Sequence, residues 1–201
     1  TTETTYYINS YAINSVGTSY GTATSFTTSS PTVTLGLSGS PLAENGGVAT
    51  VTATLNTASS KTVTVTLGAT GTATGSGTDY NLSSTTITIN AGATTGTATI
   101  TGVDDGLDES AETVIVDITG VTNGTESGTQ QVTASITDDD AAPTVTLSLS
   151  GSPLAENGGV ATLTATLNTA SSKTVTVTIG ASGTATGSGT DYTLSSTTIT
   201  I

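Results

Sequence analysis

"VATVTATLNTASSKTVTVTL", residues Val48 to Leu67, alternates apolar and polar side chains on both sides of a short polar turn. Apolar residues occupy every second position from Ala49 to Leu55 and again from Val63 to Leu67, and threonines stand between most of them. Because successive side chains of a β-strand point to opposite faces, this period predicts two strands, each with one buried and one solvated face. The stretch therefore indicates an all-β fold.

The two-residue period extends well beyond this stretch, and helical periodicity is absent. It predicts seven strands around the segments 33–37, 49–55, 63–67, 87–89, 98–100, 114–118 and 132–136. Gly, Asn, Ser and Asp clusters separate them. Seven short antiparallel strands fit an immunoglobulin-like β-sandwich better than a barrel or a propeller.

A long internal repeat sets the domain organisation. Pro31–Ile89 returns as Pro143–Ile201 with five substitutions in 59 positions, and all five preserve the apolar pattern. We therefore expect tandem sandwich domains over 30–142 and 143–201, the second present only in its N-terminal part, preceded by a separate segment over 1–29.

Composition excludes several classes of partner. The 201 residues carry a net charge of −13, with two basic side chains and no cysteine or histidine. Nucleic acids and anionic membranes attract Lys and Arg, so neither is an expected partner. Disulfides and thiolate metal sites are excluded, and no apolar run reaches the length that direct membrane insertion needs.

The acidic residues gather in particular connections between the predicted strands. Between Pro31 and Ala142 there are twelve acids and one base, so internal salt bridges cannot balance the charge. Glu44, Asp79, the run Asp104–Glu112 and the run Asp138–Asp140 lie in every second connection and at the exit. Alternate connections of an antiparallel sandwich share one end of the molecule, so these acids are expected to converge there.

A divalent cation would remove the repulsion among converging carboxylates. Ca²⁺ accepts six to eight oxygen ligands in irregular geometry, whereas Mg²⁺ prefers a strict octahedron and Zn²⁺ prefers the His or Cys that this chain lacks. The alternative is a solvated acidic surface that protects sheet edges. That interpretation is preferred for scattered acids such as Asp117 and Glu126, and Asp108 lies between the two cases.

The same residues give little support to catalysis. Paired carboxylates occur in glycosidases, but a sugar cleft is usually lined by aromatic rings, and this chain is 3% aromatic. It has no credible pair of nucleophile and base, so we expect no enzymatic activity.

Four motifs, in order, carry a family resemblance: "AENGGVATVTATL", "GSGTDY", "ITGVDDGLDESAETVIVDI" and "ASITDDD". Together they resemble the Calx-beta motif of sodium/calcium exchangers and large microbial surface proteins, over Pro31–Asp140 and in part over Pro143–Ile201. The resemblance implies bound Ca²⁺. Its implied ligands are Glu44, Asp79, Asp104, Asp105, Glu109, Glu112, Asp138, Asp139 and Asp140. Gly106 and Ala111 depart from the acidic residues frequent in the family.

The stretch Thr4–Thr28 differs from the repeats in its tyrosines. It predicts a long strand, a turn at Asn14–Gly17 and a final strand that ends at Phe26. This pattern resembles the last two strands of a fibronectin type III domain from bacterial surface proteins.

These observations predict a stalk segment of a large secreted or cell-surface bacterial adhesin, and an internal part of a longer protein. Calcium beside the linker Asp138–Pro143 would stiffen the junction between repeats, and proline limits hinge freedom there by fixing φ. The expected partners are neighbouring repeats of the same chain and a secretion or surface-anchoring machine. Two alternatives are spacer modules of a secreted multidomain hydrolase and a calcium-sensing regulatory module.

Overall fold

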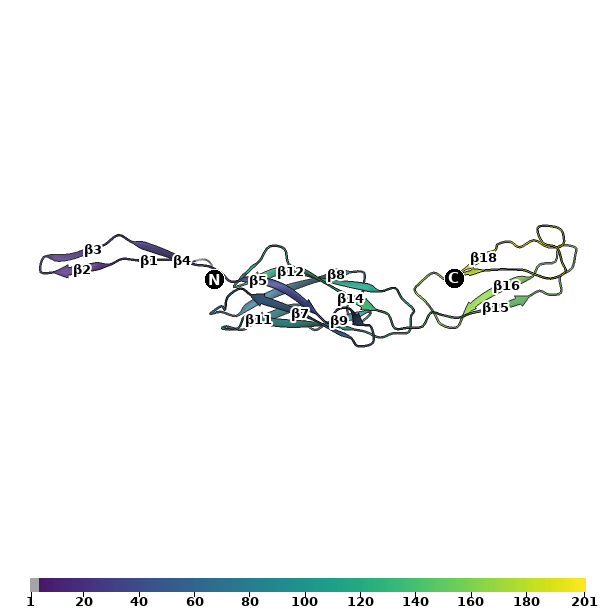
Figure 1. Ribbon diagram of the computed structural model, residues 1–201, viewed down its shortest axis with the longest axis horizontal. Helices are drawn as coiled ribbons and strands as arrows, with labels where there is room; N and C mark the ends of the chain where they lie inside the picture. Colours follow the sequence, from purple (N-terminus) through teal and green to yellow (C-terminus); the bar gives the residue numbers. More distant parts are fainter. Residues whose placement is uncertain (1–3) are drawn as a thin grey trace. The chain divides into compact units, whose positions relative to one another are not determined.

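The computed structural model describes residues 4–201, so the first three residues of the predicted segment 1–29 lie outside the description. Every regular element in the described range is a β-strand (Figure 1). None of these residues belongs to a helix long and apolar enough to cross a membrane. The chain divides into two compact units, the first comprising 1–103 and 112–136 and the second comprising 104–111 and 137–201.

Unit 1 contains a sandwich of two five-stranded sheets, in the orders β10-β8-β12-β14-β6 and β13-β5-β7-β11-β9. Their bounds are β5 (Thr32–Ser38), β6 (Leu42–Ala43), β7 (Val48–Leu55), β8 (Val63–Gly71), β9 (Tyr80–Leu82), β10 (Thr86–Ile89), β11 (Thr95–Gly102), β12 (Glu112–Thr122), β13 (Thr125–Glu126) and β14 (Gln131–Thr137). The antiparallel register places Val33 opposite Leu55 and Ala98 opposite Val51, so the apolar rows of neighbouring strands share a face.

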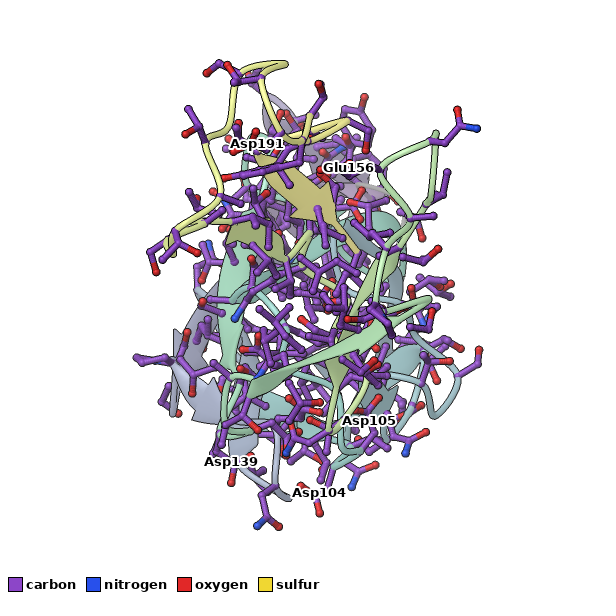
Figure 2. The ribbon with its side chains drawn as sticks, turned by 90° about the vertical axis from the view of Figure 1, so that its right-hand side faces the viewer. Asp104, Asp105, Asp139, Glu156 and Asp191 are labelled. Atoms are coloured by element: carbon purple, nitrogen blue, oxygen red, sulfur yellow. The ribbon has the colours of Figure 1, made fainter. Side chains whose placement is uncertain are left out.

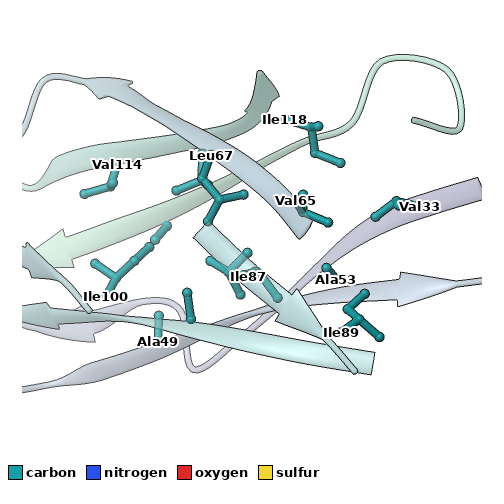
Figure 3. Packing of buried hydrophobic residues seen from close by; sticks show 14 of the residues in the cluster. Val33, Ala49, Ala53, Val65, Leu67, Ile87, Ile89, Ile100, Val114 and Ile118 are labelled. Atoms are coloured by element: carbon teal, nitrogen blue, oxygen red, sulfur yellow. The ribbon is translucent and has the colours of Figure 1, made fainter. Parts of the chain in front are cut away.

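The apolar rows of both sheets form one core (Figure 3). Side chains at every second position of β7 and of the first part of β8, Val63–Leu67, are buried, including Val51, Leu55 and Val65, while the threonines between them remain at least partly exposed. Burial of an aliphatic side chain of this size contributes about 1.5–3 kcal/mol. The alternation of Thr with Val, Ile or Leu is therefore what directs one face of each sheet inward.

The predicted fold class is confirmed, because the chain is all-β and the region 32–137 forms an antiparallel sandwich. The seven predicted strands correspond to β5, β7, β8, β10, β11, β12 and β14. The prediction missed β6, β9 and β13, which are two or three residues long, too short to show a period. Of these, β13 pairs in parallel with β5.

The N-terminal segment of unit 1 forms two small antiparallel pairs. They join β1 (Thr4–Ile8) to β4 (Thr24–Thr28) and β2 (Tyr11–Asn14) to β3 (Gly17–Tyr20). The predicted turn is present, where Asn14 Oδ1 accepts hydrogen bonds from the amides of Val16 and Gly17 at 2.9 and 3.1 Å. The predicted single long strand is instead two, β1 and β2, and the final strand ends at Thr28 rather than at Phe26.

Unit 2 has two strand pairs. They join β15 (Val145–Ser150) to β16 (Thr162–Leu167) and β17 (Thr176–Thr178) to β18 (Thr198–Thr200). The pairing of β15 with β16 reproduces that of β5 with β7, because Val145 opposes Leu167 as Val33 opposes Leu55. The same sequence therefore gives the same register in both copies.

Candidate metal centre

Glu44 lies in a tight turn directly after β6. The Glu44 carbonyl accepts a hydrogen bond from the Gly46 amide at 2.7 Å, and the Ala43 carbonyl accepts one from Gly47 at 2.9 Å. Gly46 adopts φ +70°, a conformation that glycine enters without steric cost. The turn leaves Glu44 only 5% exposed.

Asp79 lies in the turn before β9, and its own carboxylate shapes that turn. The Thr74 amide donates to Asp79 Oδ2, and the Asp79 amide donates back to the Thr74 carbonyl at 2.9 Å. Gly77 and Ser76 take positive φ values inside the turn. The result is a half-buried carboxylate held by a local backbone loop.

Two hydrogen bonds bring the turns of Glu44 and Asp79 to the end of β11. The Gly102 amide donates to the Gly47 carbonyl at 2.9 Å, and the Val103 amide donates to the Asp79 carbonyl at 3.0 Å. A Cβ at Gly102 would lie 2.5 Å from the Ala43 carbonyl oxygen, so only glycine allows this approach. Both turns thus meet the strand that leads into the acidic run.

The first carboxylate pair joins Asp79 to Glu112, the first residue of β12. Each side chain places one carboxylate oxygen within 4.8 Å of the other, and both are half-buried. The two residues are 33 positions apart in the sequence, so the sandwich topology creates this pair. Two like charges at such a distance repel by about 1 kcal/mol even in bulk water.

The second carboxylate pair, in unit 2, joins Asp138 to Asp140, whose carboxylate oxygens also lie within 4.8 Å. Among the described residues 4–201, the buried atoms Asp138 Oδ1 and Asp140 Oδ2 have no hydrogen-bond partner. Burial raises the pKa of the Asp140 carboxyl, and the negative charges around it raise that pKa further. Buried carboxylate oxygens without donors are unusual, because each loses its hydration without compensation.

The charges that act on Asp140 come from two separate parts of the sequence. They belong to Asp138, Asp139, Asp104 and Asp105. Asp104, Asp105 and Asp139 are exposed and lie in the same region of Figure 2, whereas Glu156 and Asp191 lie in another. The acidic run and the exit triplet therefore form one negative region within unit 2.

The one remaining predicted ligand, Glu109, and the undecided Asp108 have different surroundings. Glu109 is half-buried in the acidic run, and Glu112 is part of the first pair. Asp108, which was not among the implied ligands, is buried and accepts a hydrogen bond from Lys173 Nζ at 2.6 Å. That ion pair lowers the pKa of Asp108. The sequence alone did not decide between a ligand and a solvated acid for Asp108. With two lysines and fifteen acids in the chain, an ion pair between a lysine and one of the acids could have been expected.

The ligand atoms in both pairs are carboxylate oxygens from irregular segments or, for Glu112, from the first residue of β12, and such oxygens suit a hard cation. Asp138 Oδ1 and Asp140 Oδ2 have no hydrogen-bond partner within residues 4–201, and Lys173 Nζ lies 3.9 Å from the other oxygen of Asp138, Oδ2. No His or Cys is present to favour a softer metal. The residues present therefore fit Ca²⁺.

The fold and these turns define an all-β sandwich module with carboxylates gathered at its connections. The Calx-beta domain family matches residues 28–140 and 138–200. The chain belongs to the Calx-beta family, as the four motifs predicted. Domains of this family are known to bind calcium.

Solved structures give weaker likenesses. The structure described as CBD12 from CALX1.2 is 22% identical with a TM-score of 0.44, over 53% of this chain and 44% of that one. A putative carbohydrate binding protein from Bacteroides ovatus is 15% identical with a TM-score of 0.39, over 60% and 40%. This chain thus spans less than half the length of either. A comparison with curated proteins gave no match.

Proposed function

We propose that this chain is a structural segment whose turns bind Ca²⁺. One proposed ligand set contains Asp138 and Asp140, and the other contains Asp79 and Glu112. Glu44 and Glu109 are further proposed ligands, which the family resemblance implies. Asp104, Asp105 and Asp139 would add the exposed negative field around the first set. Each set offers several oxygens, and backbone carbonyls and water would complete the shell that Ca²⁺ prefers.

One observation carries this proposal. Asp138 Oδ1 and Asp140 Oδ2 are buried, and among residues 4–201 neither has a hydrogen-bond partner. A stable fold compensates buried charge with donors, with a counter-charge or with a metal. The charges around Asp140 are negative, so a cation is the expected compensation.

The mechanical role follows from the position of Asp138–Asp140. These residues directly follow β14 and directly precede the linker to the second copy, which begins at Pro143. A cation held there would order the exit of the sandwich, and Pro143 would limit φ at the hinge. Calcium would therefore stiffen the connection between successive copies.

The wider architecture is part of the same proposal. We infer a fibronectin type III-like segment over 1–29, a Calx-beta domain over 30–142 and part of a second over 143–201. Near-identical copies are typical of a structural spacer, because duplication lengthens a rod without adding an active site. We therefore propose a stalk of a secreted or cell-surface bacterial adhesin, with adjacent repeats and a surface-anchoring or secretion machine as partners.

Thermal melting in Ca²⁺ and in chelator tests the calcium role. At Ca²⁺ one hundred times its Kd, binding stabilises the folded state by about 2.7 kcal/mol. For a domain of this size that raises Tm by roughly 10 °C or more. Small-angle scattering should show a narrower distribution of particle dimensions with Ca²⁺. Identical melts and identical scattering in Ca²⁺ and chelator would refute the proposal.

A further inference from the structure

Asp108 accepts several hydrogen bonds from one short loop of the second copy, residues 171–173. Asp108 Oδ1 accepts from Lys173 Nζ at 2.6 Å, and Asp108 Oδ2 accepts from Ser171 Oγ at 3.1 Å. The Asp108 carbonyl accepts from the Ser172 amide at 3.2 Å and lies 3.0 Å from Ser171 Oγ, whose single hydroxyl hydrogen it shares with Asp108 Oδ2. Asp108 and Ser171 also form an isolated parallel β-bridge.

These contacts enclose the Asp108 carboxylate and are more than a single ion pair on the surface. Asp108 is 7% exposed, and its two carboxylate oxygens and its carbonyl all receive donors. Surface ion pairs contribute little, but a charge-assisted bond to a buried carboxylate with further donors is considerably stronger. Removal of Lys173 would leave a buried carboxylate without its counter-charge.

The repeat supplies an internal comparison. Ser171-Ser172-Lys173 is the second copy of Ser59-Ser60-Lys61, and these two lysines are the only basic residues in the chain. Within the described range 4–201, Lys61 forms no ion pair, whereas Lys173 pairs with Asp108 and lies 3.9 Å from Asp138 Oδ2. The loop therefore acquires its partner only where the acidic run of a preceding copy is available.

We propose that the Ser-Ser-Lys loop is a docking surface for the Asp108 turn of the preceding repeat, so that each repeat latches onto the one before it. The partner is a second copy of this same repeat. Because the Asp108 turn is continuous with β11 and β12, the latch ties two successive copies at a second point besides the linker. This inference goes beyond calcium binding, because Asp108 is in neither proposed ligand set.

The test uses the full 201-residue chain and follows amide hydrogen exchange at Ser172, whose N–H donates to the Asp108 carbonyl. Lys173→Gln should accelerate exchange at Ser172 about tenfold or more, as expected when a charge-assisted bond is lost. Lys61→Gln is the matched control and should leave exchange at Ser172 unchanged. The same difference is expected in Ca²⁺ and in chelator.

A cross-link gives an independent readout, because the chain has no cysteine of its own. Asp108→Cys with Ser171→Cys should form an intramolecular disulfide under mild oxidation, and Asp108→Cys with Ser59→Cys should not. An unprotected Ser172 amide in the parent chain, equal cross-linking of both pairs, or disulfide-linked dimers instead would overturn the latch. Any of these results would leave the calcium proposal intact, since that proposal depends on separate titrations.

Discussion

At the scale of single residues, the account depends on how Asp138 and Asp140 are compensated. Their carboxylate oxygens lie within 4.8 Å of each other, and burial together with neighbouring negative charge raises the pKa of Asp140. The ionised Asp140 carboxylate therefore destabilises the folded state when no cation is bound. The proposed cation would reverse this effect.

This opposition predicts a change of sign for one variant. Asp138→Asn removes a negative charge from the pair. It also removes the 3.9 Å contact with Lys173, which is weak because the Lys173 side chain is 40% exposed. In chelator the variant should therefore raise the free energy of unfolding, by up to about 1 kcal/mol. In Ca²⁺ the same change removes a ligand and should lower the stability relative to the parent chain. Denaturant unfolding under both conditions measures the two effects.

The control for this variant is Asp117→Asn, which neutralises a half-buried acid outside both pairs. It should show no calcium-dependent change of sign. If Asp138→Asn destabilised the chain equally in chelator and in Ca²⁺, the residue would be structural and not a ligand.

The residue scale also shows which site features the sequence could reveal. The Asp79 turn is encoded locally, because Asp191 in the second copy makes the same bonds, with the Thr186 amide donating to Asp191 Oδ2 at 2.6 Å. A motif such as "GSGTDY" therefore predicts its own geometry. The partner of Asp108 is 65 positions away in Lys173, and no local pattern predicts that contact.

At the scale of elements, close backbone approach decides whether the acidic turns can reach one another. Gly102 ends β11 against the Glu44 turn, where an added Cβ would lie 2.5 Å from the Ala43 carbonyl oxygen and 2.7 Å from that of Glu44. These neighbours are backbone atoms and cannot rotate away. Gly102 thus allows β11 to pack against the turn that positions Glu44, a proposed ligand.

Gly102→Ala should consequently affect both stability and calcium binding. The clash should cost about 1–3 kcal/mol of unfolding free energy, as overpacking usually does, and should weaken Ca²⁺ binding by displacing the Glu44 turn. Gly106→Ala is the matched control, because a Cβ there would meet nothing within 4 Å. Melting and calcium titration of both variants test the coupling, which equal behaviour of the two would contradict.

Strand periodicity accounts for most of what could be predicted at this scale. Alternation of Thr with Val, Ile, Leu or Ala identified the strands that carry the core, because burial of one face is what selects them. The strands β6, β9 and β13 were not predicted. Segments of two or three residues form a strand only when a neighbouring strand supplies the hydrogen bonds. The break between β1 and β2 was also not predicted, because no proline or glycine marks it in the sequence.

At the scale of the whole molecule, the repeat and its charge are the organising features. The two nearly identical copies of the repeat share one pattern of turns. The chain contains two lysines and fifteen acidic residues. The structure uses Lys173 to neutralise Asp108, while cations are proposed for the clustered acids. The proposed calcium ligands and the latch are neighbours in unit 2, because Lys173 Nζ lies 2.6 Å from Asp108 Oδ1 and 3.9 Å from Asp138 Oδ2.

Calorimetric titration of Ca²⁺ into the full chain tests the central claim most directly. The account predicts binding heat in the parent chain, loss of one component in Asp138→Asn and loss of a different component in Asp79→Asn, because these residues belong to different proposed sets. Asp117→Asn should titrate like the parent. Absence of binding heat in the parent chain, or parental titrations in both ligand variants, would contradict the claim that these acidic turns bind calcium.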